Sequence, residues 1–183
     1  MLIYVTYVLA CALLSMLALS DLRRRRLPNA MVASFAVLYF AHAWLAPEAR
    51  TGLALHVATG TAALALAAAL FRFGWLGGGD AKLFGAVFLW SGPAHASTVF
   101  FIVSMFGLML ALAQIVLGRF QRDDAAPLAL AWLAPARGVP YGVALAAGGI
   151  VAVWLPVWLP AAHPLALPLR HASWPVLAHV RLT

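Results

Sequence analysis

The chain of 183 residues is 65% hydrophobic and only 9% charged, whereas soluble domains usually carry about 25% charged residues. These proportions exclude an ordinary soluble protein and predict an all-α integral membrane protein surrounded by lipid. The net charge of +7 would suggest nucleic-acid binding in a soluble chain. Here the basic residues fall between apolar segments, so we interpret them as orientation signals and expect no nucleic-acid partner.

Apolar segments follow one another along most of the chain. Divided at charges, glycines and prolines, they predict a bundle of about six transmembrane helices in residues 1–160, because about 20 apolar residues cross a bilayer as a helix. A proline-rich outer tail is expected over residues 161–183. The predicted spans are 2–20, 29–46, 52–71, 81–92, 96–117 and 139–160.

The third predicted span, residues 52–71, is nearly all alanine, leucine, glycine and threonine. Small residues let membrane helices approach closely, so we expect this span at the centre of the bundle. The alternative is an ordinary alanine-rich helix that faces lipid. The fourth span, residues 81–92, is short for a full crossing and is expected at the interface or buried among its neighbours.

Charges around the first span predict the orientation. No charged residue precedes Asp21 and four arginines follow it directly, which is the reverse of a secretory signal peptide. Six spans then place nine basic residues inside and three outside, so we expect a multi-pass protein of the inner (cytoplasmic) membrane with both termini outside. The inside residues are Arg23, Arg24, Arg25, Arg26, Arg72, Lys82, Arg119, Arg122 and Arg137, and the outside residues are Arg50, Arg170 and Arg181.

Two of the five acidic residues stand out by their position. Asp21 ends the first span and Asp80 begins the fourth, so both are expected at the cytoplasmic face, next to apolar helix. Acids at membrane depth are costly and usually face a protein interior or a watery cavity. Two carboxylates at one level can hydrolyse a bond without a metal or other cofactor, one activating water and the other donating a proton. Glu48, Asp123 and Asp124 are interpreted as solvated loop charges.

A glycine turn leads into the second aspartate. Gly77, Gly78 and Gly79 remove side chains directly before Asp80, which allows close approach by another helix or by an extended substrate strand. The alternative interpretation is structural, with Asp80 capping the next helix and Asp21 pairing with neighbouring arginines. Spacing alone leaves both interpretations open.

Each aspartate belongs to a longer stretch. The sequence DLRRRRLPN at residues 21–29 continues from Asp21 through a basic loop to a helix start at Pro28 and Asn29. The sequence GGGDAKL at residues 77–83 places Lys82 two residues after the second aspartate. A third stretch, GVPYGVAL at residues 138–145, starts the last predicted helix.

In this order on a six-span chain, the three stretches resemble the type IV prepilin peptidases, which are membrane aspartic proteases of the GxGD type. The third stretch is similar to the family's Pro-Tyr-Gly helix start through Pro140 and Tyr141, although Val143 stands where a proline is common. The resemblance covers about residues 2–155.

The resemblance implies an aspartic endopeptidase that cleaves the leader peptide of pilin-like precursors at the cytoplasmic membrane face. Asp21 and Asp80 would be its catalytic pair, and a precursor's hydrophobic segment would dock laterally against the bundle. We interpret Lys82 mainly as an interfacial anchor. The residues expected to shape the site or contact substrate are Gly77, Gly78, Gly79, Pro28, Asn29, Lys82, Pro140 and Tyr141.

Long prepilin peptidases carry an added cytoplasmic segment with paired cysteines and also methylate the new N-terminus. This chain has neither the segment nor the pair, since Cys11 is its single cysteine. It resembles the short form associated with Flp or Tad pili, so we expect peptidase activity without methyl transfer. Archaeal preflagellin peptidases share the core plan and are an alternative within the same chemistry.

Histidines offer an alternative from another class. His42 and His56 fall near the outer ends of adjacent spans and could ligate haem in a redox protein. His163, His171 and His179 in the tail could bind a metal together, although prolines intervene and no acid accompanies them.

Two further alternatives use residues near the aspartates. Paired intramembrane acids also serve as proton relays, so a proton-coupled transporter is possible. Ser20 and Lys82 could form a serine–lysine protease. A pair of acids that catalyses hydrolysis accounts better than either alternative for two costly charges at membrane depth.

Overall fold

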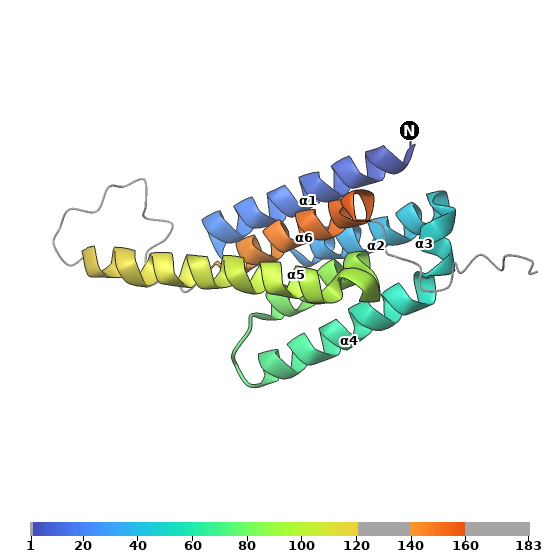
Figure 1. Cartoon of the computed structure of the whole chain (residues 1–183). Helices are drawn as coiled ribbons and strands as arrows, with labels where there is room; N and C mark the ends of the chain where they lie inside the picture. The colour runs from blue at the N-terminus through green and yellow to red at the C-terminus, as the bar shows by residue number, and fades with distance from the viewer. Residues whose placement is uncertain (1, 121–139, 160–183) are drawn as a thin grey trace, which may run out of the picture.

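The computed structural model describes residues 2–120 and 140–159, and these residues form helices and no strands (Figure 1). Asp123, Asp124, the first two residues of the third stretch and the tail with its three histidines lie outside the described residues. The helices are α1 (Leu2–Arg24), α2 (Asn29–Leu45), α3 (Pro47–Thr51), α4 (Leu53–Arg72), α5 (Gly78–Phe120) and α6 (Tyr141–Trp158).

Four described helices are long and apolar enough to cross a membrane, namely α1, α4, α5 as far as Val116, and α6. The apolar helix α2 is shorter, with 17 residues. An all-α, multi-pass membrane protein is therefore confirmed, while the count of about six spans stays a prediction.

Helix α5 consists of two helices that meet at Gly92, whose backbone is not helical (φ 59°, ψ −178°). Gly149 of α6 lies against Val87, and its neighbour Gly148 lies against Val103. Residues 87 and 103 would be about 24 Å apart in a straight helix with a rise of 1.5 Å per residue. The chain therefore reverses at Gly92, as Figure 1 shows. We call residues 78–91 the first half of α5 and residues 93–120 its second half.

The first half of α5 is the central helix of the bundle, because every residue from Leu83 to Gly92 is buried. Its indole Trp90 Nε1–H donates to the carbonyl of Phe35 at 3.0 Å, and the two rings stack. Of the two positions expected for the short fourth span, residues 81–92, the structure therefore shows burial among the neighbouring helices.

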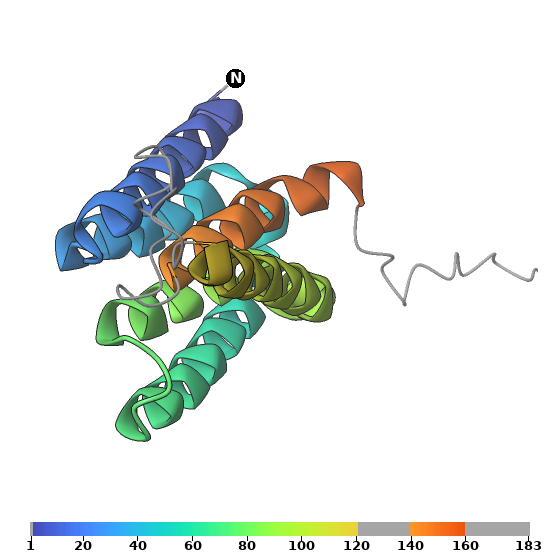
Figure 2. The same ribbon diagram turned by 90° about the vertical axis from the view of Figure 1, so that its left-hand side faces the viewer.

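The expectation that residues 52–71 lie at the centre is wrong. Helix α4 buries only Gly60, Ala63 and Ala67, and Figure 2 shows it at the outside of the bundle, with α5 between it and α6. A Cβ added at Gly60 would lie 2.9 Å from the Cβ of Leu89. Small residues bring α4 close to α5 along one face only, so the structure supports the alternative of an outward-facing helix.

A histidine compensates for the proline after the reversal. Pro93 has no N–H, so the carbonyl of Leu89 loses its partner in the helix. His56 Nδ1 lies 2.9 Å from that carbonyl oxygen and supplies the donor. His42 Nδ1 lies 3.0 Å from the hydroxyl of Thr6. These contacts give both histidines packing roles, so their positions lend no support to the haem alternative.

We expect Gly92→Ala to destabilise the protein more than Gly74→Ala. Both glycines have positive φ, 59° at Gly92 and 76° at Gly74. Gly92 also has ψ −178°, a combination essentially restricted to glycine, which costs another residue about 1–3 kcal/mol. A Cβ at Gly92 would also overlap the imidazole of His56, whereas one at Gly74 meets nothing within 4 Å. Thermal unfolding in detergent measures the difference. Equal midpoints for the two variants would show that packing around Gly92 is not limiting.

Candidate active site

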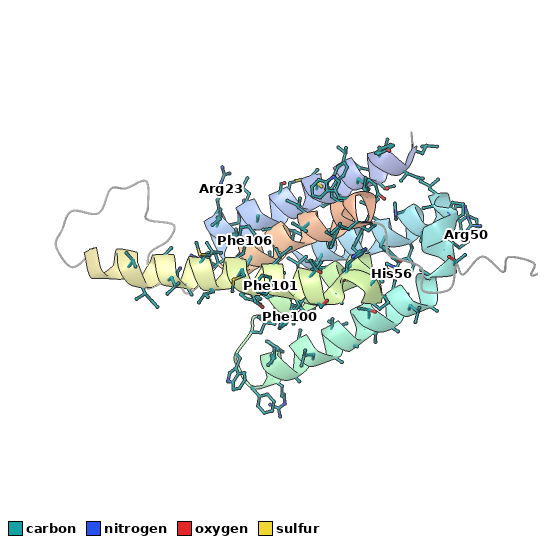
Figure 3. All side chains as sticks on the ribbon, viewed as in Figure 1. Arg23, Arg50, His56, Phe100, Phe101 and Phe106 are labelled. Carbon is teal, nitrogen blue, oxygen red and sulfur yellow. The ribbon has the colours of Figure 1, made fainter. Side chains whose placement is uncertain are left out.

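Three helix ends meet at one end of the bundle. Asp21 lies in the last turn of α1, Asp80 in the first turn of α5, and Tyr141 begins α6. Figure 3 shows Arg23 at this end and Arg50, a residue of α3, at the opposite end. The structure therefore brings the two predicted aspartates to one level of the bundle.

The carboxylate of Asp80 is held by the turn that precedes it. Helix α5 begins at Gly78, so Gly77 is the N-cap residue and Asp80 stands at the third helical position. The backbone N–H of Gly77 donates to the Asp80 carboxylate, which is the backward reach of a capping box. Asp80 therefore caps the start of α5, as the structural interpretation of this residue expected. The same carboxylate is half-buried and feels the charge of Asp21.

The glycines before Asp80 lie close to neighbouring groups. A Cβ on Gly77 would lie 2.5 Å from Asp80 Oδ2, and a Cβ on Gly79 would lie 3.0 Å from the Cβ of Leu27. Gly78 lies between them and starts the helix. A side chain at either outer glycine would push the aspartate or the helix start out of place.

Asp21 is buried, with 7% of its surface exposed, and faces the start of α6. The backbone N–H groups of Gly142 and Val143 donate towards its carboxylate, as helix N-termini do for anions. Arg25 adds a positive charge nearby, so pairing with a neighbouring arginine is also part of the geometry. Within residues 2–120 and 140–159, Asp21 Oδ2 is buried and accepts no hydrogen bond. That oxygen therefore retains unused capacity to accept a hydrogen bond.

The start of α6 completes the enclosure. Pro140 is fully buried and is the N-cap residue of the helix. Tyr141 is half-buried and lies close enough to Asp80 to feel its charge. The Cε2 atom of its ring lies 3.2 Å from the position that a Cβ on Gly107 would take. Tyr141 thus lies near Asp80, and Pro140 starts the helix whose first N–H groups reach Asp21.

Gly142 was not singled out by the sequence analysis, although it lies directly against the carboxylate of Asp21. A Cβ there would lie 2.8 Å from Asp21 Oδ2 and 2.9 Å from its Cγ. The available signal was its position, since a glycine directly after a proline and a tyrosine at a helix start leaves room for a neighbouring group.

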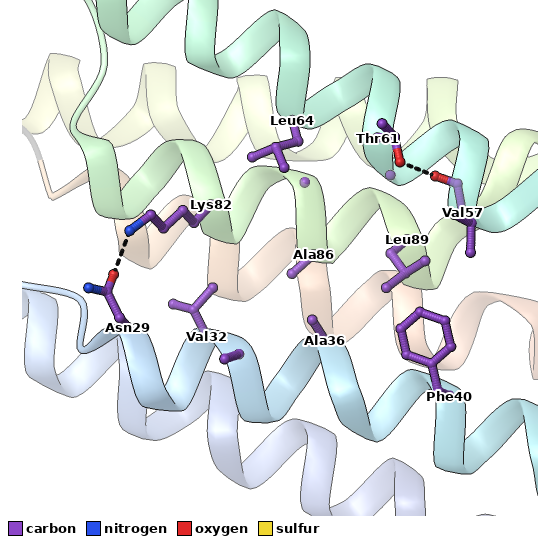
Figure 4. Close-up of a pocket in the computed structure, with 13 residues that line it drawn as sticks. Asn29, Val32, Ala36, Phe40, Val57, Thr61, Leu64, Lys82, Ala86 and Leu89 are labelled. Atoms are coloured by element: carbon purple, nitrogen blue, oxygen red, sulfur yellow. Dashed lines mark hydrogen bonds between the residues drawn. The ribbon is translucent and has the colours of Figure 1, made fainter.

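Pro28, Asn29 and Lys82 form a separate group on the other side of α5. The carbonyl of Pro28 accepts the N–H of Val32 at the start of α2. Lys82 Nζ donates to Asn29 Oδ1 at 2.9 Å, as Figure 4 shows. Residues two apart on a helix point to opposite sides, so Lys82 points away from Asp80.

We expect Lys82→Gln to have only a small effect on catalytic activity. The Lys82–Asn29 hydrogen bond is exposed, and exposed polar pairs contribute about 1 kcal/mol or less, which corresponds to a loss of about fivefold at most. Initial rates of precursor cleavage in membranes measure the effect. A loss of a hundredfold or more would assign Lys82 a part in the chemistry.

Other combinations of reactive residues are not brought together. Ser20 Oγ donates to the carbonyl of Arg26 at 2.8 Å, while Lys82 bonds Asn29, so the serine–lysine alternative gains no support. In the described part of the chain, no three His, Cys, Asp or Glu side chains are grouped to hold a metal ion.

Comparison with known proteins gave one match. The model of a family described as the type IV leader peptidase family matches residues 8–112, more than half of the chain. The match includes Asp21 and Asp80 and ends before Tyr141. No curated protein and no solved structure matches the chain.

Proposed function

The chain belongs to the type IV leader peptidase family, and on this premise we propose that it is a membrane aspartic endopeptidase with Asp21 and Asp80 as its catalytic pair. The observation that supports this most directly is the placement of both carboxylates at one end of the bundle, on the last turn of α1 and the first turn of α5. Two acidic side chains at one level of a membrane bundle are energetically costly, and a role in hydrolysis accounts for their presence.

The proposed chemistry uses only this pair and water. Two adjacent carboxylates repel when both are ionised, so one proton is shared between them. The ionised member takes a proton from water as the water oxygen bonds to the scissile carbonyl carbon. The protonated member gives its proton to the amide nitrogen as the carbon–nitrogen bond breaks. The products are a carboxylic acid and an amine, and the pair has exchanged roles; the new carboxylic acid then releases its proton to the amine or to water.

The surrounding residues orient this pair in the proposal. Backbone N–H groups at the start of α6 hold Asp21, and the N–H of Gly77 holds Asp80. Fixed dipoles of this kind need no reorganisation during the reaction, which makes them effective in a site shielded from water. Tyr141 and Pro140 close the side towards α6.

We infer that the substrate is a pilin-like precursor with a hydrophobic segment, cleaved at the cytoplasmic face of the inner membrane. The arginines that follow Asp21, together with Arg72 and Lys82, lie on the helix ends and turns nearest the site, and basic residues favour the cytoplasmic side. Under this orientation the N-terminus is outside. The absence of paired cysteines from the sequence supports a short, Flp-type enzyme without methyl transfer.

The test is co-expression of the chain with a panel of full-length pilin-like precursors, with the precursor mass measured before and after. We expect one or more precursors to lose the leader, and the new N-terminus to carry no added methyl group. If every precursor stays intact beside a membrane-inserted, folded chain, the proposed function is wrong.

A further inference from the structure

An open apolar groove runs along the first half of α5, on the side away from the aspartates. Helices α2 and α4 form its walls and α5 forms its floor, as Figure 4 shows. Its volume is about 450 Å³. Small residues supply much of the lining, namely Ala33, Ala36, Gly60, Thr61, Gly85 and Ala86.

Small side chains make this groove suitable for another helix. A Cβ on Gly85 would lie 2.8 Å from the Cβ of Leu64, so this glycine lets α4 approach the floor. On the other wall Ala33 and Ala36 present only methyl groups. Helices in lipid associate mainly by close packing, and surfaces of small residues permit the closest approach.

One end of the groove lies beside the candidate active site. Lys82 and Asn29 line that end, and Lys82 is two residues from Asp80. The two sides of α5 are separated there by its glycine start, the turn Gly77–Gly79, where Gly77 is exposed while Gly78 and Gly79 face the side chains of Phe71 and Leu27. A helix is about 10 Å across and an extended residue spans about 3.3 Å, so three or four extended residues cross the turn.

We propose that this groove binds an apolar helical segment of the substrate, whose adjoining extended residues cross the Gly77–Gly79 turn and place the scissile bond at Asp21 and Asp80. The inference rests on the proposed function. Continuity of the groove with the site, together with walls from two helices, favours a substrate helix over a single lipid chain. The scissile bond is therefore expected within about four residues of the docked helix.

Tryptophan substitutions that fill the groove test the proposal. Ala36→Trp and Thr61→Trp place a ring in the groove, whereas the control variants Val37→Trp and Leu66→Trp place one on exposed faces of the same helices. We expect the groove variants to cleave the full-length precursor at least tenfold more slowly than their controls. Equal rates in variant and control would overturn the inference.

A shortened substrate separates docking from catalysis. A peptide that contains the leader and scissile bond but no apolar segment is expected to be cleaved equally, though slowly, by wild type and Ala36→Trp. Equal loss on both substrates would show that the substitution damages the site itself and would count against separate docking. If the wild type cleaves no substrate, the proposed function fails rather than the groove.

Cross-linking gives an answer that does not depend on activity. In a Cys11→Ser, Asp80→Asn background, Ala36→Cys is expected to form a disulfide with a cysteine placed in the precursor's apolar segment, and Val37→Cys is not. Cross-linking at neither position or at both would overturn the inference. A change in co-purified phospholipid for Ala36→Trp, with unchanged cleavage, would identify a lipid site and also overturn it.

Discussion

Replacing either Asp21 or Asp80 with asparagine is expected to abolish precursor cleavage. Asparagine keeps the shape of the side chain but neither takes the proton from water nor donates one to the leaving nitrogen. General acid–base catalysis contributes about 10²–10⁴-fold, so a loss of at least about a hundredfold is expected for each variant. Initial rates of leader loss, followed by mass, give the measurement.

Glu48→Gln is the matched control, since Glu48 belongs to α3, which lies at the opposite end of the bundle. We expect this variant to cleave at the wild-type rate. Because the two aspartates act as one pair, the double variant should lose no more activity than the single variants. Continued cleavage by both single variants would refute the catalytic assignment. Loss of solute uptake with continued cleavage would instead support a proton-coupled transporter.

Helix ends were predictable from the sequence where glycine, proline or charge marks them. The predicted span 29–46 matches α2, which follows Pro28 and ends at Leu45, because a proline marks a helix boundary by fixing its own φ and lacking an N–H. The start of α5 was less well placed. Its helix includes Gly78 and Gly79, which sequence reasoning assigned to the turn, because capping by Asp80 stabilises one more turn of helix.

The depth of each helix in the bundle was not predictable from composition. Residues 52–71 and 81–92 are both apolar and rich in small residues, yet only the second is buried along its length, with Lys82 as its one exposed residue. The reversal at Gly92 decides this difference, because it folds the second half of α5 back beside the first. A Gly-Pro pair predicts a break in a helix but does not specify the direction of the next one.

The proximity of the two aspartates was predictable from topology. Each aspartate lies at the end of a span on the same membrane face, and such ends lie at one level. The contacts that orient them join residues far apart in the sequence, as Gly142 does with Asp21. Likewise, Lys82 and Asn29 are 53 positions apart. No local pattern predicts such pairs, because they depend on the relative rotation of α1, α5 and α6 about their axes.

Gly142→Ala is expected to reduce cleavage by about ten- to a hundredfold while leaving the protein folded. The added Cβ would lie 2.8 Å from Asp21 Oδ2 and 3.1 Å from its Cβ. The carboxylate must move to relieve this overlap, and displacement of a reacting group by about 1 Å can lower the rate about a hundredfold. The measurement compares kcat for cleavage with the thermal midpoint of the same preparation.

Gly149→Ala, on the same helix, separates misplacement of Asp21 from general crowding. Its Cβ would lie 3.0 Å from Leu14 and 3.1 Å from Val87, both apolar side chains of the core. This variant should therefore lose thermal stability, by about 1–3 kcal/mol for an overpacked core, and keep its kcat per folded molecule. If Gly142→Ala lost stability and retained kcat in the same way, α6 would be a packing helix rather than the support of the catalytic pair.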